Sequence, residues 1–394
     1  MAQLADVIVL GGGIVGASTA YALVKQGKNV MLIEQFKPGH SKGSSHGDGR
    51  VVRFNYTEAI YVEMAMLAYK AWDKLSADAG ETLIRETGLI EYGPKGNEAI
   101  QLSSDILKKY EIPFETLSAE DAMARFPQYS FQADSDIIYQ PGGAVAMATP
   151  AVKALWRLFK ENGGTAITGK RIESIDVQVD SVRLTSSDGE TFDAENLVLA
   201  AGGWTKQLAA QLNLDLPLDV TQEILAYFPP KDESVNHAVG TMPVMIEYYG
   251  MPGDDSGADF YCLPMVDVPG VKLGWHHSGI PMQADDERII SDEIMNGLRY
   301  WVRHQFPHLN DEAIEVVTCL YTNTPDYHFI LDKHPDYAHV TIGAGFSGHG
   351  FKFGPLLGEL LAGLVTGAEL PVSLDTFKIA RFSKPESLDK RVGA

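Results

Sequence analysis

The sequence predicts an α/β fold in which a domain built on a parallel sheet is interrupted by a second, sheet-rich α+β domain. Three observations support this prediction. A buried strand, a glycine-rich turn and a helix follow one another within residues 7–27. Between residues 215 and 320, aromatic residues, prolines and alternating strands replace that pattern. The 394 residues also exceed what one hydrophobic core usually holds, which favours two domains.

The start of the chain has the element order of a Rossmann-type nucleotide-binding unit. The apolar run at residues 7–10 is typical of a strand covered on both faces. GGGIVG, residues 11–16, follows it and matches G-x-G-x-x-G. A helical pattern then stops at Gly27, and a second strand at residues 30–33 ends at Glu34. The spacing predicts strand, turn, helix and strand in that order.

Each glycine of this turn has a physical role. Gly11 permits the tight turn, Gly13 lets a pyrophosphate approach the backbone, and Gly16 lets the helix pack on the strand. The pyrophosphate would lie at the helix N-terminus, where free N–H groups and the dipole favour anions. Glu34 would accept hydrogen bonds from ribose hydroxyls, which disfavours NADP and leaves FAD and NAD open. The alternative is a glycine-rich turn without function, and the complete context argues against it.

The segment SKGSSHGDGRVVRF, residues 41–54, departs from an ordinary unit of this kind. Its polar, glycine-rich loop carries Ser44, Ser45 and His46. Arg50 and Arg53 follow three residues apart, and on a helical turn they would project in neighbouring directions. Such a pair suits a phosphate or a substrate carboxylate, because arginine offers a rigid bidentate fork. The alternative is solvated surface charge.

The middle of the chain continues the first domain and then leaves it. A helix near residues 152–159 has one apolar face. Residues 171–192 alternate and turn at Asp188-Gly189, which predicts a hairpin. The buried strand NLVLAA then runs into Gly202, where we expect a second close approach of backbone to the nucleotide.

The inserted domain contains the segment GVKLGWHHSG, which reads as a strand with Lys272, Gly274 and His276 on one face. Lys272 and His276 would lie about 13 Å apart at their Cα atoms, given a rise of about 3.3 Å per residue. They could flank a planar ligand, with Gly274 leaving room between them and Tyr261 facing the same space. The alternative is an exposed sheet edge with ordinary polar residues.

Near the C-terminus, IGAGFSGHGFKFGPLLGELLAGLVTG opens from a strand into a glycine-rich loop and then a leucine-rich helix. Lys352 is expected at the N-terminus of this helix, which is unfavourable for a cation by the dipole alone. An anion held by both the lysine and the helix end would explain the placement. The alternative is a packing helix with a chance lysine.

Cysteine usage leaves one question open. Cys319, in VVTCLYTNTPDYHF, could be a small buried residue, a thiolate nucleophile or the anchor of a covalently attached group. Together with Cys262 it makes neither a disulfide framework nor a zinc set, so a reducing, cytoplasmic compartment and no metal site are expected. The 32 basic and 52 acidic residues give a net charge of -20, which disfavours nucleic acid and anionic membranes as partners. No signal peptide or membrane span is predicted.

Taken together, these residues resemble the monomeric sarcosine oxidase and N-methyltryptophan oxidase family, within the wider D-amino-acid-oxidase-like flavoproteins. The resemblance covers essentially the whole chain and is carried by GGGIVG with Glu34, SSHGDGRVVR, VKLGWHH, CLYTNTPDYHFILD and GFSGHGFKF. It implies that FAD is the cofactor, attached through an 8α-S-cysteinyl bond to Cys319. It also implies that Arg53 and Lys352 hold a substrate carboxylate and that Lys272 aids the reaction with oxygen.

Further roles follow from the same resemblance. Arg50 is expected close to the flavin ring, His276 on the substrate side, and Tyr261 and Tyr321 near the amine. Gly49 departs from the threonine of better-known members, which removes a hydroxyl contact near Lys272. The implied cofactor contacts are Gly11, Gly13, Ile14, Val15, Gly16, Glu34, Gln35, Ser44, Ser45, His46, Arg50, Ile172, Gly202, Trp204, Cys319, Gly345, Phe346, Gly348, His349, Gly350 and Lys352.

The expected activity is oxidation of a secondary amino acid, with an N-methyl, N-alkyl or cyclic amine, by FAD and O2 to give an imine and hydrogen peroxide. One rival is a dehydrogenase of the same fold that passes electrons to a quinone or a partner protein. Another is a flavin-carrying protein without catalysis. A monomer is expected. The predicted domains are 1–85, 146–214 and 321–394 for FAD binding, and 86–145 and 215–320 for the substrate.

Overall fold

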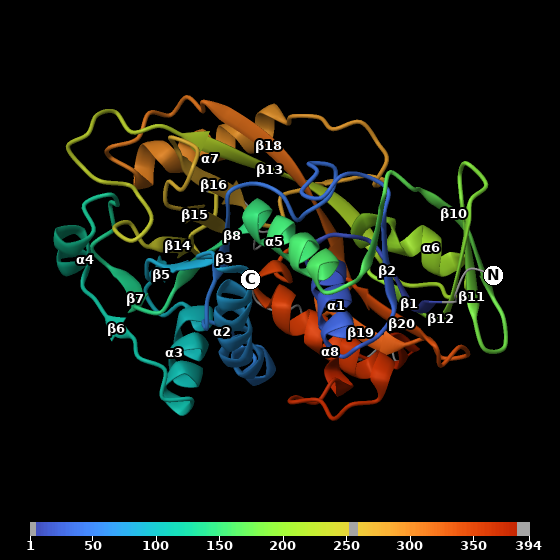
Figure 1. The fold of residues 1–394 in the computed structure, drawn as a ribbon. Coiled ribbons are helices and arrows are strands. Elements are labelled where there is room, and N and C mark those ends of the chain that lie inside the picture. The colour runs from blue at the N-terminus through green and yellow to red at the C-terminus, as the bar shows by residue number, and fades with distance from the viewer. Residues whose placement is uncertain (1–4, 252–258, 384–394) are drawn as a thin grey trace.

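A computed structural model describes residues 5–251 and 259–383. Its strands form three sheets, with helices packed against them (Figure 1). The elements outside the sheets are α-helices and short 3-10 helices. They are α1 (Ile14–Lys25), α2 (Ala59–Ala79), α3 (Glu98–Lys109), α4 (Ala119–Arg125), α5 (Ala148–Glu161), α6 (Thr205–Ala210), α7 (Asp292–Gln305), α8 (Gly354–Thr366), η1 (Gly202–Trp204), η2 (Phe351–Phe353), η3 (Asp375–Phe377) and η4 (Ile379–Ser383).

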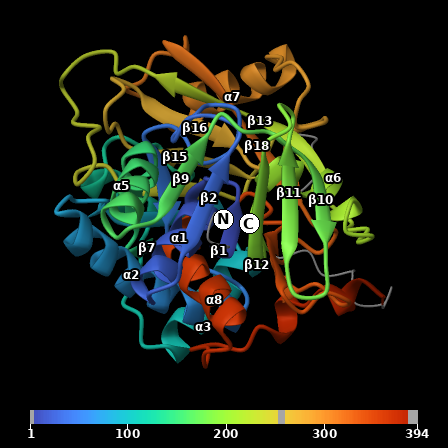
Figure 2. The ribbon, with the colours of Figure 1, turned by 45° about the vertical axis from the view of Figure 1, so that its right-hand side comes forward.

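The first sheet has the order β10-β11-β12-β1-β2-β9, with β20 added beside β12 and β19 beside β20. Its strands are β1 (Ala5–Leu10), β2 (Val30–Glu34), β9 (Thr165–Thr168), β10 (Ile172–Val177), β11 (Val182–Ser186), β12 (Thr191–Leu199), β19 (Ile330–Lys333) and β20 (Val340–Ala344). Strands β9, β2, β1, β12 and β20 run parallel, and the β10–β11 hairpin extends one edge (Figure 2). This is the doubly covered sheet that the opening motif predicts.

The second sheet has the order β17-β13-β16-β15-β14-β5-β7-β6, with β18 paired to β13. Its strands are β5 (Leu89–Pro94), β6 (Glu115–Thr116), β7 (Ser135–Gln140), β13 (Asp219–Phe228), β14 (Val244–Glu247), β15 (Phe260–Leu263), β16 (Val271–Trp275), β17 (Ile280–Pro281) and β18 (Glu315–Asn323). A small third sheet joins β3 (Gly49–Val52), β8 (Ala144–Met147) and β4 (Ile84–Glu86).

Close helix packing fixes the glycine turn against the first sheet. Helix α1 contacts both α5 and α8, and ten of its twelve residues are buried. A side chain at Gly358 of α8 would bring its Cβ within 2.4 Å of the Ser18 backbone in α1. A Cβ at Gly354 would come within 2.3 Å of Ile14. Glycine at these positions therefore lets the two helices approach each other closely.

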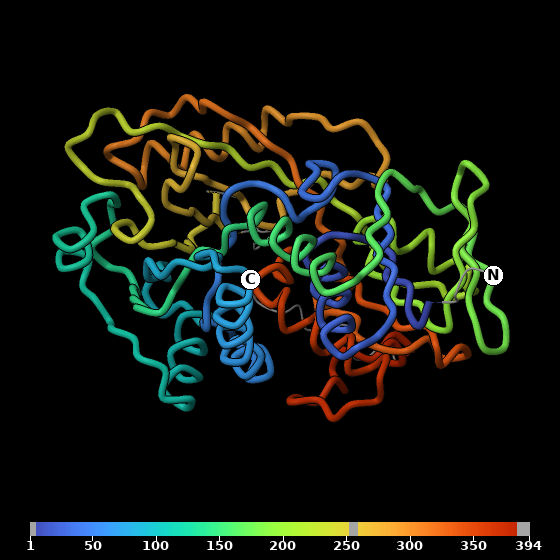
Figure 3. Tube along the Cα trace, viewed as in Figure 1, coloured from blue at the N-terminus to red at the C-terminus, as the bar shows by residue number. Residues whose placement is uncertain are grey.

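The path of the chain explains how distant segments meet. In Figure 3 the chain leaves the first sheet in green, forms the upper part in yellow and orange, and returns in red. Strands β13 and β18 lie side by side in antiparallel register over nine residue pairs. Strand β18 thereby brings Cys319 toward the first sheet.

The predicted fold class is confirmed: an α/β nucleotide-binding unit is joined to a sheet-rich second part. The domain boundaries stay a prediction, and the boundary placed at 320/321 falls inside β18. In the part of the chain that the structure describes, no helix has the length and apolar character needed to cross a membrane.

Candidate active site

The glycine turn between β1 and α1 forms one end of a cavity. Gly11 has a φ of 105°, and a Cβ there would come within 2.3 Å of the Ala200 carbonyl oxygen. A Cβ at Gly16 would lie 1.8 Å from the Gly11 carbonyl oxygen, so Gly16 is required for the turn to close on the helix. The Ile14 N–H donates to Ser45 Oγ at 3.0 Å. The start of α1 and the Ser45 hydroxyl therefore meet at this end of the cavity, which both residues line.

Glu34 organises the neighbouring wall. Its Oε2 accepts from the Gly12 N–H at 2.7 Å, and its Oε1 accepts from the Phe36 N–H at 2.9 Å. His40 Nε2 lies 3.6 Å from the same carboxylate. The acid at the end of β2 thus holds the glycine turn in addition to lining the cavity.

Most of the predicted site residues share this cavity. Those that line it are Gly11, Gly13, Ile14, Val15, Glu34, Gln35, Ser44, Ser45, Arg50, Arg53, Ile172, Gly202, Trp204, Tyr261, His276, Cys319, Tyr321, Phe346, Gly348, His349, Gly350 and Lys352. They come from both ends of the sequence and from all three sheets or the loops that join them. The cavity therefore extends from the glycine turn to the second sheet.

Four predicted residues lie outside the cavity wall, and each has another role. Gly16 closes the turn, as described above. Gly345 has a φ of 62°, and a Cβ there would lie 2.4 Å from Thr324. His46 Nε2 lies 3.1 Å from the Thr318 carbonyl oxygen, and burial beside Arg50 lowers its pKa to about 4, so its imidazole is neutral. Lys272 is the fourth.

The expectation that Arg50 and Arg53 share a helical turn is wrong. Arg50 lies within β3 and Arg53 directly follows that strand. Arg50 Nη2 donates to the Ser44 and His46 carbonyls at 3.0 and 2.7 Å, which folds the 44–46 loop around the guanidinium. Both arginines nevertheless line the cavity.

Lys272 is buried in β16 and donates to the Gly49 carbonyl oxygen at 2.9 Å. Burial, with the Arg50 guanidinium nearby, lowers its pKa to about 7. A Cβ at Gly49 would lie 2.8 Å from Val145, so there is no room for a threonine here unless Val145 moves. Residue 49 therefore contacts Lys272 through its backbone carbonyl, although it lacks the threonine hydroxyl of better-known family members.

Gly274 does not leave room for a ligand, contrary to expectation. A Cβ at this position would lie 2.6 Å from the Tyr261 ring, so the glycine accommodates that tyrosine instead. Strand β16 ends at Trp275, and His276 lies just past it. Lys272 and His276 therefore do not form one continuous strand face.

Arg53 is almost fully buried, lines the cavity and forms an ion pair with Glu91. Its Nη1 lies 3.6 Å from Glu91 Oε1 and makes no hydrogen bond within the described part of the chain. Glu91 is already satisfied by Asn55 (2.8 Å), Ser103 (2.9 Å) and Tyr248 (2.8 Å). The remaining hydrogen-bonding capacity of Arg53 is thus available to an anion in the cavity.

Lys352 lies in η2, which runs directly into α8, two residues before the first residue of that helix. Its Nζ donates to the Tyr56 hydroxyl at 2.7 Å and to the His349 carbonyl at 3.1 Å. Burial, together with the Arg53 guanidinium, holds the pKa of Lys352 well below its usual range. An anion between the two cations would relieve that repulsion.

A histidine and two tyrosines face the cations. His276 Nδ1 lies 2.9 Å from the Tyr321 hydroxyl, and the two rings meet edge to face at 5.3 Å. The Tyr261 ring meets His276 at 6.2 Å. Burial holds the pKa of His276 well below its usual range, so its imidazole is neutral. The site therefore offers a neutral proton acceptor beside two buried cations.

Comparison with known proteins identifies the family to which this chain belongs. The sequence profile of the FAD dependent oxidoreductase family (DAO) matches residues 6–364. The chain belongs to this family. It is 36% identical to the peroxisomal sarcosine oxidase of Mus musculus over 384 residues, 96% of each chain. It is 31% identical to the monomeric sarcosine oxidase of Bacillus sp. strain B-0618 over 390 residues, 98% of each chain.

Among solved structures, NikD has a TM-score of 0.84 at 23% identity, over 95% of this chain and 97% of its own. NikD is described as an unusual amino acid oxidase essential for nikkomycin biosynthesis, and at this identity it shows a shared fold. The predicted resemblance to the sarcosine oxidases is confirmed, and so is the prediction of an FAD-dependent enzyme.

The residues present fit FAD. The α1 N-terminus and the close-packed glycine turn form the end expected for the pyrophosphate. The wall at the other end includes Cys319 of β18, with 5% of the residue exposed, and burial raises the pKa of its thiol to about 11. Arg53 and Lys352 line the same cavity, where a substrate carboxylate would bind.

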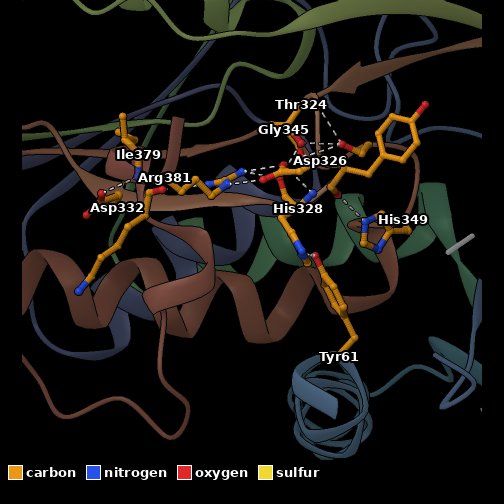
Figure 4. Close-up of polar contacts among 12 residues, drawn as sticks. Tyr61, Thr324, Asp326, His328, Asp332, Gly345, His349, Ile379 and Arg381 are labelled. Carbon is orange, nitrogen blue, oxygen red and sulfur yellow. Dashed lines mark hydrogen bonds and ion pairs between the residues drawn. The ribbon is translucent and has the colours of Figure 1, made fainter. Parts of the chain in front are cut away.

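An ion pair of low exposure supports this FAD-dependent oxidoreductase site from the C-terminal side (Figure 4). Arg381 of η4 donates to Asp326 through Nε at 2.7 Å and Nη2 at 3.2 Å, with side-chain exposures of 11% and 3%. Arg381 also donates to the His328 carbonyl at 2.9 Å. The same turn supplies the Tyr327 carbonyl that contacts His349 Nε2 at 3.1 Å. The pair thus holds the turn that positions a cavity histidine.

Replacing Arg381 with methionine should lower the free energy of unfolding by about 1.5–3 kcal/mol, because hydrogen bonds to a charged group are lost and Asp326 stays buried. Urea unfolding followed by circular dichroism measures this change. The control is Lys378→Met, since Lys378 pairs with Asp375 at the exposed surface and should change stability by about 1 kcal/mol or less. Equal effects of the two variants would contradict the prediction.

Sequence reasoning missed several residues of the site. Tyr56 bridges Lys352 to His349 Nδ1, and Asp259 and Gly12 line the cavity. Gly12 was the unassigned glycine of the opening motif and could have been included. Tyr56 gave no signal, because its contact with Lys352 joins residues 296 positions apart.

Proposed function

We propose that the protein oxidises a secondary amino acid, with an N-methyl, N-alkyl or cyclic amine, to an imine that hydrolyses, while O2 is reduced to hydrogen peroxide. The observation that carries this proposal is the convergence of two buried cations, Arg53 and Lys352, on one cavity beside the neutral His276. Two curated relatives of similar length are named sarcosine oxidases, which supports an N-methyl amino acid as the substrate class.

The protein's own groups would bind and prepare the substrate. Arg53 and Lys352 would hold its carboxylate through charge-assisted hydrogen bonds. Burial and the Arg53 guanidinium hold the pKa of Lys352 below its usual range, and a bound carboxylate would raise that pKa again. His276 would accept a proton from the substrate ammonium, leaving the neutral amine that can be oxidised. Bound FAD supplies the two-electron acceptor for that oxidation.

We also propose that the FAD is attached covalently to Cys319. The support is the position of this cysteine in the cavity wall and its match to the motif CLYTNTPDYHF. Acid precipitation of the purified yellow protein should give a coloured pellet that is heavier by one FAD. The Cys319→Ser variant should give a colourless pellet of unmodified mass. A colourless wild-type pellet would mean a non-covalent flavin and would remove this part of the proposal.

The contact between Lys272 and the Gly49 carbonyl keeps a dehydrogenase as the second candidate, because a changed partner for this lysine can alter the reaction with oxygen. Peroxide formed per substrate oxidised under air separates the two. A ratio near one supports the oxidase, and substrate turnover that requires an added quinone supports the dehydrogenase.

The setting that we propose is a monomer in a reducing, cytoplasmic compartment. Both cysteines are free and buried, which is consistent with such a compartment. Size-exclusion chromatography with light scattering tests the monomer, and a mass near twice 43.0 kDa would contradict it.

A further inference from the structure

A buried carboxyl group faces the proposed tether from the neighbouring strand. Glu223 of β13 is paired directly with Cys319 of β18 in the antiparallel register. Directly opposed residues lie on one face of a sheet with Cβ atoms about 4.5–5.5 Å apart. Leu225, two residues after Glu223 on the same strand face, packs with Cys319 and Tyr321, so this face of β13 is the one that carries Cys319 on β18. Leu225, Cys319 and Tyr321 all line the cavity.

Glu223, which lies behind the cavity wall on the same face of β13 as Leu225, has an unused hydrogen-bond acceptor. With 2% of the residue exposed, its Oε1 accepts from the Thr221 hydroxyl at 2.6 Å, while its Oε2 has no hydrogen-bond partner among the described residues. Burial raises the pKa of Glu223 to about 7, opposed in part by Thr221 and the Gly279 N–H. A buried, half-satisfied carboxyl is costly, so a role in the chemistry of the site would explain its presence.

Cys319 needs such a group if it is to react. Its pKa of about 11 means that the thiol is protonated at neutral pH, whereas the thiolate is the nucleophile. Arg50 cannot accept a proton, and Lys272 of β16 is paired with Tyr227 of β13 and not with Cys319. Glu223 therefore has the free acceptor best placed by strand pairing. The charged and titratable groups around Cys319 and Glu223 are Arg50, Lys272, Arg288, Tyr261 and Tyr321.

We propose that Glu223 accepts the thiol proton of Cys319 as the cysteine becomes joined to FAD. This inference rests on the covalent attachment proposed above. In the step, a bond forms between the sulfur and the 8α carbon of FAD, and one C–H bond of that carbon breaks. The thiol proton passes to Glu223, and the C–H proton passes to solvent. The electron pair of the C–H bond stays on the flavin, and dioxygen then removes two electrons to form hydrogen peroxide.

The test compares attachment rates in the full chain. Wild-type and Glu223→Gln proteins are produced in riboflavin-depleted cells and mixed with FAD in air. Flavin retained after acid precipitation, and protein mass, are followed over time. Glu223→Gln should bind FAD as tightly as the wild type, measured by quenching of flavin fluorescence, but attach it at least about tenfold more slowly, within the range for loss of a proton-transfer group.

The pH profile gives a readout that a purely structural role would not change. The carboxylate form of Glu223 becomes populated as pH rises through about 7, so the wild-type attachment rate should rise over that range. The variant should lack this rise and accelerate only toward the higher pKa of the thiol. Glu223→Asp keeps a carboxylate and should recover the rise near neutral pH.

A matched control is Glu247→Gln. Glu247 of β14 is also buried, with an unpaired Oε2 and a pKa raised by burial to about 8, but it does not lie opposite Cys319. It should attach FAD at the wild-type rate. Attachment by Glu223→Gln at the wild-type rate, or loss of FAD binding in both Glu223 variants, would overturn the inference while the tether stands. A wild type that never attaches FAD would overturn both.

Discussion

Replacing Lys352 with methionine should raise KM for the amino-acid substrate by about 10- to 150-fold while FAD stays bound. A hydrogen bond to a charged group contributes about 1.5–3 kcal/mol, and each 1.4 kcal/mol is tenfold in binding. Lys352 is buried beside Arg53, and its Nζ is already oriented by the Tyr56 hydroxyl and the His349 carbonyl. Methionine keeps the length of the side chain and removes the charge. Steady-state kinetics and the flavin absorbance measure the two quantities.

Two controls test whether the change in KM comes from the contact between Lys352 and the substrate carboxylate. Lys74→Met removes a lysine whose ion pair with Glu359 is exposed, and it should leave KM unchanged. An N-methyl amine that lacks a carboxylate should react with the Lys352 variant and the wild type at similar KM. If Lys352→Met left the KM of the amino acid unchanged, the assignment of Lys352 to the carboxylate would be wrong.

Local chemistry explains the part of the site that could be predicted. The glycine turn depends on residues within one strand–turn–helix unit, so its sequence identifies it, and Gly11 and Gly16 are confirmed as positions where a side chain would collide with backbone. Cys319 and Lys352 were placed by motifs whose residues are close in sequence, and both line the cavity. These predictions needed no knowledge of which distant strands pair.

The rest depends on pairings that the sequence does not display. Glu223 and Cys319 are 96 positions apart and become opposed only through the register of β13 with β18. Gly274 was interpreted as space for a ligand, because the packing of Tyr261 from β15 against it could not be foreseen. Arg50 and Arg53 were expected on a helical turn, but β8 pairs with this segment and makes it a strand.

Replacing Lys272 with methionine should slow reoxidation of the reduced enzyme by dioxygen about 10²–10³-fold, the typical effect of removing one group that stabilises developing negative charge. Reduction by substrate without oxygen should stay close to the wild-type rate, because Lys272 is not among the residues that line the cavity. Stopped-flow absorbance of the flavin measures both half-reactions. An artificial electron acceptor in place of oxygen serves as the control and should reoxidise both proteins alike.

The pH dependence sharpens this prediction. Burial near Arg50 lowers the pKa of Lys272 to about 7, so the ammonium form is present below that pH and is lost above it. The wild-type rate constant with oxygen should therefore fall as pH rises through about 7, and the variant should be slow and flat over the same range. A variant as fast as the wild type would show that the Gly49 carbonyl holds Lys272 in a packing role. It would also favour an electron acceptor other than oxygen.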